Sequence, residues 1–285
     1  MKIRAENLKH IYDEGSPFER IAVDDINTSF NSGEFIGIVG KTGSGKSSFI
    51  LHLNGLLKPV SGRLLVDDED VWANGYPIKE LRRRVGLVFQ YPEHQLFEEN
   101  VFADVCFGPR NLGLSKTEID ERAADALRLV GLGEETWKKS PFELSGGQKR
   151  RAAIAGVLAM RPEVLVLDEP AAGLDPAGRN SILSAVSDIQ SQTGAAIVLV
   201  SHNMEDVSKF CKRIIIMGNG RILAEGAPKE IFDDSVLLET AGLLPPPAAV
   251  IMSKLRAAGL DLPKGIFTVK DAARVLLEYA SKCAV

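Results

Sequence analysis

The sequence predicts an α/β fold built around a mainly parallel β-sheet. Two short apolar runs, residues 164–167 and 195–200, have the length of strands covered on both faces, and polar side chains follow each of them. A third buried strand is predicted at residues 34–39, where the chain runs into a glycine-rich turn and then into residues with helical spacing. Strands that alternate with helices in this way are typical of parallel sheets.

Composition places the chain among ordinary globular proteins. Its 285 residues are 45% hydrophobic and 25% charged, enough for one elaborate domain or for one domain with a small extension. The net charge of −4 shows no basic excess, so we expect no nucleic-acid partner. Cys106, Cys211 and Cys283 fit neither a metal spacing nor a disulfide framework, which favours a reducing cytosol.

No stretch of the sequence has the character of a membrane anchor. No apolar run approaches the roughly 18 residues that a spanning helix needs, and residues 1–6 lack the apolar core of a signal peptide. We therefore expect a protein that is not integral to a membrane, although it could dock on one.

The turn after the third strand is the most informative stretch. Residues 40–47 fit G-x-x-x-x-G-K-[ST], the phosphate-binding loop, in which backbone N–H groups point at a polyphosphate and the next helix adds its dipole. Lys46 would reach the β- and γ-phosphates, and the Ser47 hydroxyl would hold Mg²⁺. The alternative is a chance glycine-rich turn, which the flanking strand and helix disfavour. The predicted ATP-binding residues of this segment are Gly40, Lys41, Thr42, Gly43, Ser44, Gly45, Lys46, Ser47 and Ser48.

An antiparallel β-subdomain is predicted before this loop, with strands near residues 3–8 and 21–30. Tyr12 lies at the end of the first strand, where its ring could stack on a purine base. A plain strand tyrosine with a solvated hydroxyl is the alternative, and Phe18 is a rival aromatic nearby.

Gln90 follows another predicted strand, residues 85–89. The carboxyl ends of such strands are where α/β sheets bind ligands, and an amide there can offer its oxygen to Mg²⁺ or to a water molecule. Taken alone, the residue is better explained as a solvated glutamine at the end of a strand.

Residues from about 91 to 160 have a helical pattern, which predicts a helical insertion. Within it, Ser145, Gly146, Gly147 and Gln148 precede a helix. Ser145 is a good N-cap, and the glycines expose backbone N–H groups that could bind an anion. A bound nucleotide has one γ-phosphate, so one chain needs only one such cradle for it. We hypothesise that this second cradle serves a nucleotide on another copy, head to tail; a capped helix start is the alternative.

Acidic and imidazole side chains follow the two central strands. Asp168 would bind Mg²⁺ through water, and Glu169 would take a proton from an attacking water. The alternative is a pair of acids that caps the turn before Pro170. His202, which follows the next strand, could donate to a γ-phosphate oxygen.

The last part of the chain changes character. Two short edge strands are predicted at residues 213–217 and 221–224, and the prolines at 245–247 break the pattern. Two amphipathic helices follow in an extension that either packs back on the core or forms a subunit interface. Their apolar positions are Ala248, Ile251, Met252 and Leu255, and then Val269, Ala272, Ala273 and Leu276.

Taken in order, the phosphate loop, Gln90, residues 145–148, the pair Asp168-Glu169 and His202 resemble the ATP-binding-cassette (ABC) ATPases. The resemblance implies a P-loop NTPase core over residues 1–235, with a helical subdomain at about 91–160. Residues 236–285 would be a helical extension and a candidate dimerisation element. Within the family, residues 86–97 and 104–113 look like the ATPase subunits of energy-coupling factor (ECF) transporters.

This resemblance implies roles for several residues, with ATP and Mg²⁺ as cofactors. Tyr12 would stack on adenine, and Asp175 would tie two nucleotide sites together across a dimer. Gln90 would couple Mg²⁺ and the nucleotide state to a membrane partner bound beside residues 92–97. The implied catalytic residues are Glu169, His202 and Gln90; the implied metal ligands are Ser47, Gln90 and Asp168; the cradle acting in trans is Ser145, Gly146, Gly147 and Gln148.

The resemblance also implies partners and a place in the cell. The partners would be a second ABC ATPase subunit, identical or a sibling, a transmembrane scaffold subunit and a substrate-binding membrane subunit. Together they would import vitamins or transition-metal ions, with this chain on the cytoplasmic face of a prokaryotic cell membrane. The alternative is the ATPase subunit of another ABC importer subfamily.

Overall fold

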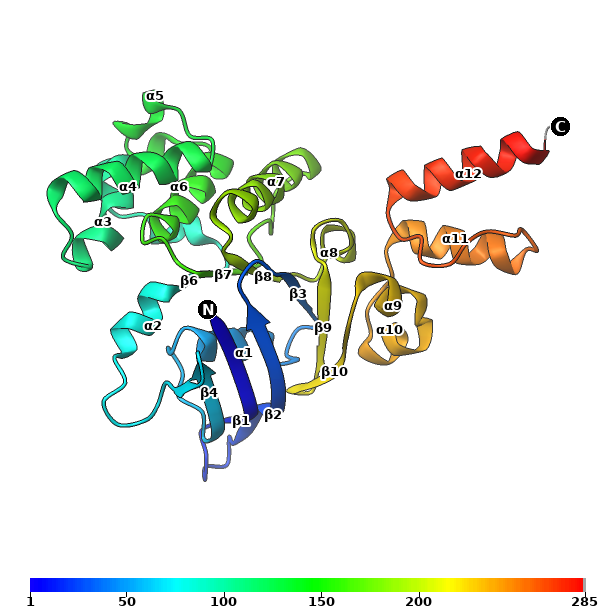
Figure 1. Cartoon of the computed structure of the whole chain (residues 1–285), viewed down its shortest axis with the longest axis horizontal. Coiled ribbons are helices and arrows are strands. Elements are labelled where there is room, and N and C mark those ends of the chain that lie inside the picture. Colours follow the sequence, from blue (N-terminus) through cyan, green and yellow to red (C-terminus); the bar gives the residue numbers. More distant parts are fainter. Residues whose placement is uncertain (284–285) are drawn as a thin grey trace.

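The computed structural model describes residues 1–283 and contains the predicted α/β core (Figure 1). Its larger sheet has six strands, all parallel to their neighbours except β10, which runs antiparallel to β9. The three central strands are buried along their whole length, as expected for a sheet with helices on both faces. In spatial order the strands are β10 (Arg221–Gly226), β9 (Arg213–Gly218), β3 (Phe35–Val39), β8 (Ala196–Val200), β7 (Val164–Asp168) and β6 (Val85–Val88).

One strand of this sheet differs from the sequence prediction. Both β9 and β10 were expected at an edge, but only β10 lies there. β9 is inserted between β10 and β3 and pairs in parallel with β3. Ile214, Ile215 and Ile216 explain the difference, because three successive buried isoleucines supply apolar side chains to both faces of the sheet.

The N-terminal residues form the predicted antiparallel subdomain, a sheet in the order β2-β1-β4-β5. Helix α1 lies between the two sheets, where the Phe49 ring is 6.1 Å from that of Phe30. The pairing of β1 with β2 places Tyr12 opposite Arg20. The elements are β1 (Lys2–Tyr12), β2 (Arg20–Asn31), α1 (Lys46–Leu53), β4 (Ser61–Val66), β5 (Glu69–Asp70) and α2 (Ile78–Arg84).

The predicted helical insertion forms a separate lobe at the upper left of Figure 1. Ser145 caps one of its helices as expected, by accepting a hydrogen bond from the backbone N–H of Gln148. Ser115 caps a second helix in the same way, by accepting one from the backbone N–H of Glu118. The elements are the 3₁₀ helix η1 (Pro92–Gln95), α3 (Val101–Asn111), α4 (Lys116–Leu129), α5 (Glu134–Trp137), the 3₁₀ helix η2 (Pro141–Glu143) and α6 (Gly146–Leu158).

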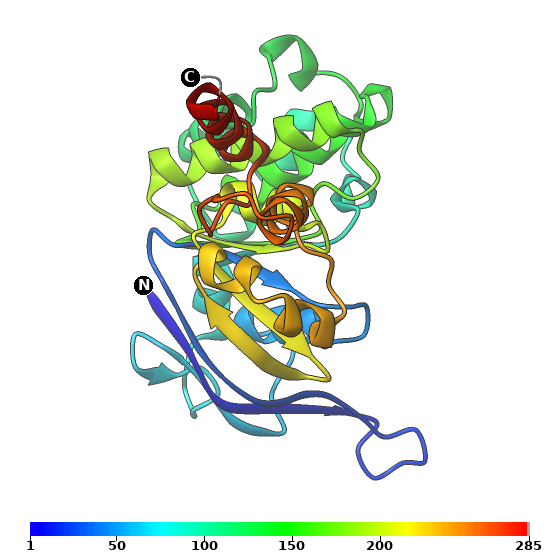
Figure 2. The same ribbon diagram turned by 90° about the vertical axis from the view of Figure 1, so that its right-hand side faces the viewer.

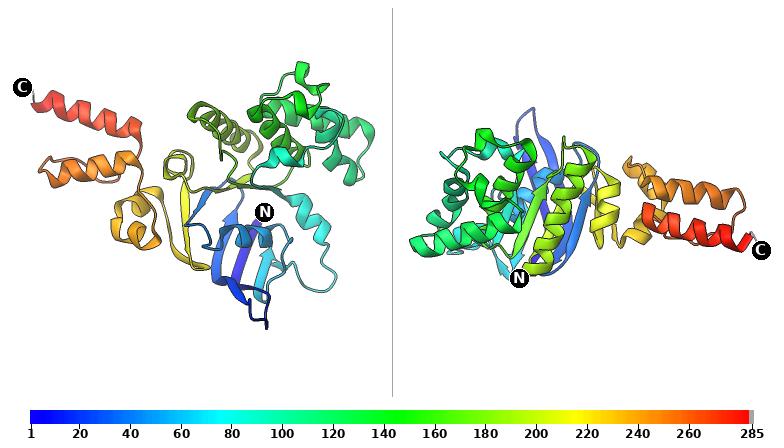
Figure 3. Two further views of the ribbon diagram at one scale, coloured as in Figure 1. Left: turned by 180° about the vertical axis from the view of Figure 1, so that it is seen from behind. Right: turned by 90° about the horizontal axis from the view of Figure 1, so that it is seen from above.

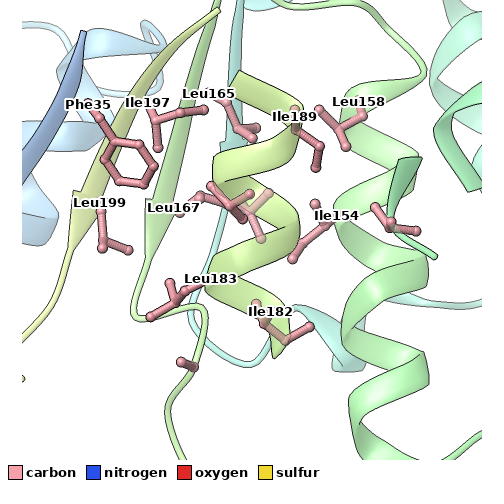
Figure 4. Close-up of a cluster of buried hydrophobic side chains, with 14 of the residues drawn as sticks. Phe35, Ile154, Leu158, Leu165, Leu167, Ile182, Leu183, Ile189, Ile197 and Leu199 are labelled. Atoms are coloured by element: carbon pink, nitrogen blue, oxygen red, sulfur yellow. The ribbon is translucent and has the colours of Figure 1, made fainter. Parts of the chain in front are cut away.

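Helix α7 (Pro176–Thr193) joins the sheet to the helical lobe (Figure 4). Leu183 and Ile189 lie on its buried side, with Leu167 of β7 toward the sheet and Ile154 of α6 toward the lobe. The same apolar core continues under α8 (Met204–Phe210). Because one core spans both lobes, the helical insertion is packed firmly against the sheet.

The C-terminal region has two parts. Helices α9 (Pro228–Asp233) and α10 (Ser235–Ala241) cover β9 and β10 (Figure 2), and the main core extends through them to Leu243. Helices α11 (Pro247–Ala257) and α12 (Val269–Cys283) pack on each other around a small cluster of their own. Figure 3 places this helix pair and the helical lobe at opposite ends of the molecule.

The buried face of this helix pair differs partly from the predicted stripe. Ile251, Val269 and Ala273 are exposed, whereas Val275 is buried. The two helices share a small cluster of their own, which buries fewer positions on each helix than a large core would. Within residues 1–283, no helix combines the length and the apolar character that crossing a membrane requires.

We expect replacement of Leu167 by alanine to lower the free energy of unfolding by about 2–5 kcal/mol, because the change leaves a cavity in a fully buried strand. Denaturant titration followed by circular dichroism measures the loss. Leu277→Ala is the control, since that side chain is 72% exposed. Equal effects of the two changes would contradict the assignment of this core.

Candidate nucleotide site

The phosphate loop passes through two positions where only glycine fits. Gly40 has φ of +157°, and a Cβ placed there would lie 2.3 Å from the carbonyl oxygen of Met217. Gly45 has φ of +98°, and its Cβ would lie 2.2 Å from the carbonyl oxygen of Ala22. Because the backbone of Met217 or Ala22 occupies the space where a Cβ would lie, no side chain fits at either position. The surrounding fold thus fixes the path of the loop.

Lys46 points back into the loop that precedes it. Its Nζ donates hydrogen bonds to the carbonyl oxygens of Gly40, at 2.7 Å, and Lys41, at 3.0 Å. Burial lowers the pKa of the Lys46 ammonium, and the nearby carboxylates of Glu169 and Asp168 oppose that shift. A cation is thus held at the centre of the loop, among backbone groups oriented for a phosphate.

The loop opens into a cavity of about 440 Å³ at the carboxyl edge of the large sheet. Sequence positions far apart meet at this edge, from β1, β6, β7 and β8. A larger cavity, of about 870 Å³, contains none of the predicted site residues. The nucleotide-sized cavity is lined by Tyr12, Arg20, Ala22, Gly40, Thr42, Gly43, Gly45, Lys46, Ser47, Ser48, Gln90, Asp168, Glu169 and His202.

Two oxygen-bearing side chains converge beside the loop. The Ser47 hydroxyl donates a hydrogen bond to Asp168 Oδ2 at 3.1 Å. Burial raises the pKa of Asp168, and the Ser47 hydrogen bond acts in the opposite direction. Hydroxyl and carboxylate oxygens are the ligands that hard cations such as Mg²⁺ prefer, so this pair fits the predicted metal site.

Glu169 and His202 form a second pair in the lining of the same cavity. The Glu169 backbone has φ of +50°, which turns its side chain away from the line of β7, and its N–H bonds to the carbonyl oxygen of Val200 at 3.0 Å. His202 Nδ1 lies 2.7 Å from Glu169 Oε1. Both residues, with Gln90, also line an adjoining cavity of about 180 Å³. The carboxylate therefore lies beside space for a small molecule such as water.

Tyr12 and Arg20 form the outer wall of the cavity. The Tyr12 hydroxyl donates a hydrogen bond to Ser48 Oγ at 3.3 Å, while Phe18 is 81% exposed and lines no part of the cavity. The sequence prediction missed Arg20. Its guanidinium lies 3.4 Å from where a Cβ of Gly43 would be, and it forms no ion pair among residues 1–283. Arg20 could have been found by pairing the two predicted strands, because that pairing places it opposite Tyr12.

The side chains of two predicted loop residues, Ser44 and Lys41, do not line the cavity. Ser44 is buried behind the loop. The Lys41 side chain packs on Gly242, the residue that ends α10: a Cβ there would lie 1.5 Å from Lys41 Cε. Only the backbone groups of these two residues remain available to a phosphate in the loop.

The second glycine cluster lies apart from this cavity, at the start of α6. Ser145 and Gln148 form a reciprocal capping box, and a Cβ at Gly146 or Gly147 would meet no atom within 4 Å. Asp175 caps α7 nearby by accepting a hydrogen bond from the N–H of Gly178 at 2.6 Å. The chain thus carries two helix N-termini fit for phosphate, and it does not bring them together by itself.

A family-level comparison agrees with this geometry. Residues 23–172 match the model of the ABC transporter family. The matched segment contains the phosphate loop, Gln90, the second glycine cluster and the paired carboxylates. The fold and the site define an ATP-binding cassette, which binds ATP and hydrolyses it.

Known relatives narrow the assignment further. The chain is 50% identical to the energy-coupling factor transporter ATP-binding protein EcfA2 of Clostridium tetani, over 98% of this chain and 97% of that protein. It is 48% identical to the protein of the same name from Caldanaerobacter subterraneus, with 98% of each chain covered. The chain therefore belongs to the ATP-binding proteins of energy-coupling factor transporters, within the ABC transporter family.

Solved structures give the same result. cbiO1 of Clostridium perfringens, part of the ABC transporter complex cbiONQ, superposes with a TM-score of 0.75 at 38% identity, covering 88% of this chain and 98% of that one. The cassette MJ0796, solved as a dimer bound to ADP and Pi, superposes with a TM-score of 0.70 at 27% identity, covering 79% and 98%. The predicted P-loop NTPase fold is confirmed.

We expect Arg20→Gln to weaken ATP binding about tenfold, equivalent to about 1.4 kcal/mol, because the guanidinium has no carboxylate partner and faces the cavity. Isothermal titration with ATP measures the affinity. Arg63→Gln is the control, since Arg63 lies on β4 outside the cavity and pairs with Glu6. Unchanged affinity in the Arg20 variant would remove this residue from the site.

Proposed function

We propose that this chain powers an ECF-type importer as one half of a head-to-tail ATPase dimer. One observation carries the proposal: the phosphate loop and the open cradle at residues 145–148 lie on separate parts of one chain. Two copies related head to tail would pair each loop with the other copy's cradle. The solved dimer of the cassette MJ0796 supports the association of two cassettes.

The partner cassette is an identical copy or a sibling, and Asp175 is the residue that we propose couples the two sites. It lies at the start of α7, six residues after Glu169, and it accepts a hydrogen bond from Gly178, which lines the same cavity as Ser145. We also propose residues 236–285 as a dimerisation element. Ile251, Val269 and Leu277 support this role, because all three are apolar and more than half exposed.

Mg²⁺ fits the oxygen pair of Ser47 and Asp168, and Gln90 lines the same cavity. We propose these three side chains as its ligands, directly or through water. When bound, the ion would neutralise charge on the β- and γ-phosphates. Lys46 would bind the same phosphates from inside the loop.

The catalytic step that we propose uses Glu169 and His202. The Glu169 carboxylate would accept a proton from a water that attacks the γ-phosphate in line. His202, 2.7 Å from that carboxylate, would orient it and donate to a γ-phosphate oxygen. Gln90 lines both cavities and would report the state of the nucleotide to the segment that follows it.

That segment is our candidate for the docking site of the membrane subunits. Phe97 is 62% exposed, and its ring meets that of Phe107 edge-on at 5.0 Å, which leaves an apolar surface beside η1. We propose a transmembrane scaffold subunit there, with a separate substrate-binding membrane subunit for vitamins or transition-metal ions. The chain would then lie on the cytoplasmic face of a prokaryotic cell membrane.

Replacing Glu169 by glutamine should lower the ATP turnover rate by at least about a hundredfold, because the general base is lost. ATP binding should persist, so the variant should accumulate ATP-dependent dimers. Turnover is measured by phosphate release, and dimers by size-exclusion chromatography with light scattering.

Lys46→Ala is the matched comparison for this experiment. It should lose nucleotide affinity and therefore form no ATP-dependent dimers. Near-normal turnover of Glu169→Gln would remove Glu169 from its role. A strictly monomeric Glu169→Gln protein at saturating ATP would contradict the head-to-tail dimer.

The membrane partners can be identified directly. We expect affinity purification of the tagged chain from solubilised membranes, followed by mass spectrometry of the intact complex, to recover a scaffold subunit and a small substrate-binding membrane protein. Recovery of an extracytoplasmic solute-binding protein would instead assign the chain to another ABC importer subfamily.

A further inference from the structure

A charged side chain outside the proposed catalytic groups lies in the interior of the helical lobe. Arg150, two residues after Gln148 on α6, is 2% exposed. Charged side chains are almost never buried to this degree unless they are paired. The hydrogen-bond partners of Arg150 therefore indicate the role of this residue.

The first partner belongs to the segment that follows Gln90. Arg150 Nη2 donates to Glu93 Oε1 at 2.6 Å and Nε donates to Glu93 Oε2 at 3.0 Å, a two-point pairing of guanidinium with carboxylate. Burial, the largest single influence, would raise the pKa of Glu93. The hydrogen bonds and charge of Arg150, together with a backbone hydrogen bond and the nearby His94, bring the pKa below its ordinary value. The pair fixes η1 against α6 in both distance and orientation.

The second partner belongs to the turn that follows Glu169. Arg150 Nη1 donates to the carbonyl oxygen of Ala172 at 2.6 Å. The N–H of Ala172 in turn donates to the carbonyl oxygen of Glu169 at 3.0 Å. A continuous series of hydrogen bonds thus runs from the backbone of Glu169, through Arg150, to Glu93.

We propose that Arg150 is a positioning residue for ATP hydrolysis. Its guanidinium makes three segments move as one body: the cradle at the start of α6, the segment after Gln90 and the turn after Glu169. It does not line the nucleotide cavity, so it acts through these segments and not by contact with ATP. The inference rests on the proposed function, because the cradle matters only in a dimer.

Arginine is required for this role because the two partners lie in different directions. A lysine ammonium could pair with Glu93 or reach Ala172, but its single nitrogen cannot reproduce the planar fork that holds both. A glutamine in place of Glu93 keeps the shape of the side chain and removes the charge that holds the guanidinium.

The test compares Arg150→Lys and Glu93→Gln with the unaltered chain, each assembled with its partner cassette and membrane subunits. We expect either change to lower kcat about tenfold or more, because small displacements of reacting groups are costly. The KM for ATP should change less than about twofold, because the phosphate loop and Tyr12 are untouched. The double variant should be no slower than the slower single variant, as expected for two residues that act as a unit.

Glu163→Gln is the control, because Glu163 forms a comparable two-point pair with Arg84 at the amino end of β7. Its melting temperature should fall less than that of Glu93→Gln, because Glu163 is 41% exposed and Arg84 keeps Asp67 as a partner. Its kcat should stay within about twofold of the unaltered value. If Glu93→Gln and Arg150→Lys also retain kcat within that range, or if their KM rises in step with the loss of kcat, the positioning role is wrong. An unaltered complex without ATPase activity would instead refute the proposed function.

Discussion

The parallel pairing of β3, β8 and β7 is the constraint on which the rest of the site depends. Ile38 of β3 and Asp168 of β7 both lie opposite Val200 of β8, so the three strands end at the same level. The groups that follow them, the phosphate loop, Glu169 and His202, consequently meet at one edge. A slip of one residue between these strands would move the loop relative to its carboxylates by about 3.3 Å, the rise of one strand residue.

The two helix N-termini that are suited to phosphate lie in different parts of the chain. Helix α1 begins at the carboxyl edge of the sheet and offers its N-terminus to the cavity, whereas α6 begins in the helical lobe and offers its N-terminus to solvent. Both ends favour anions for the same electrostatic reason. In the head-to-tail dimer that we propose, a polyphosphate bound to one copy would attract a second copy, and association would be linked to nucleotide concentration by mass action.

Much of this site follows from local sequence. The apolar runs that become β3, β7 and β8 fix the sheet, the glycine spacing fixes the loop, and Ser145 marks the start of α6. These features are local because strand burial, backbone freedom and helix capping are each decided within a few residues. The fold class is therefore predictable from local patterns, and so are the site residues that lie in the loop or at the ends of the strands.

The remainder depends on side-chain directions and on contacts distant in sequence. Arg20 reaches the cavity only because of the register of a hairpin, and Arg150 meets Glu93 across 57 positions of chain. The place of β9 inside the sheet and the exposed side of α12 were decided by which neighbours compete for burial. Local patterns contain no information on such competition.

The contact of Lys41 with Gly242 has a consequence for where the catalytic unit ends. The second residue of the phosphate loop rests on the last turn of α10, and the main core reaches Leu243. A fragment cut before α10 would expose apolar core and would free one wall of the loop to solvent. The smallest portion of this chain that keeps the surroundings of its nucleotide intact is thus defined by tertiary contact and extends through Leu243, beyond the last strand of the sheet.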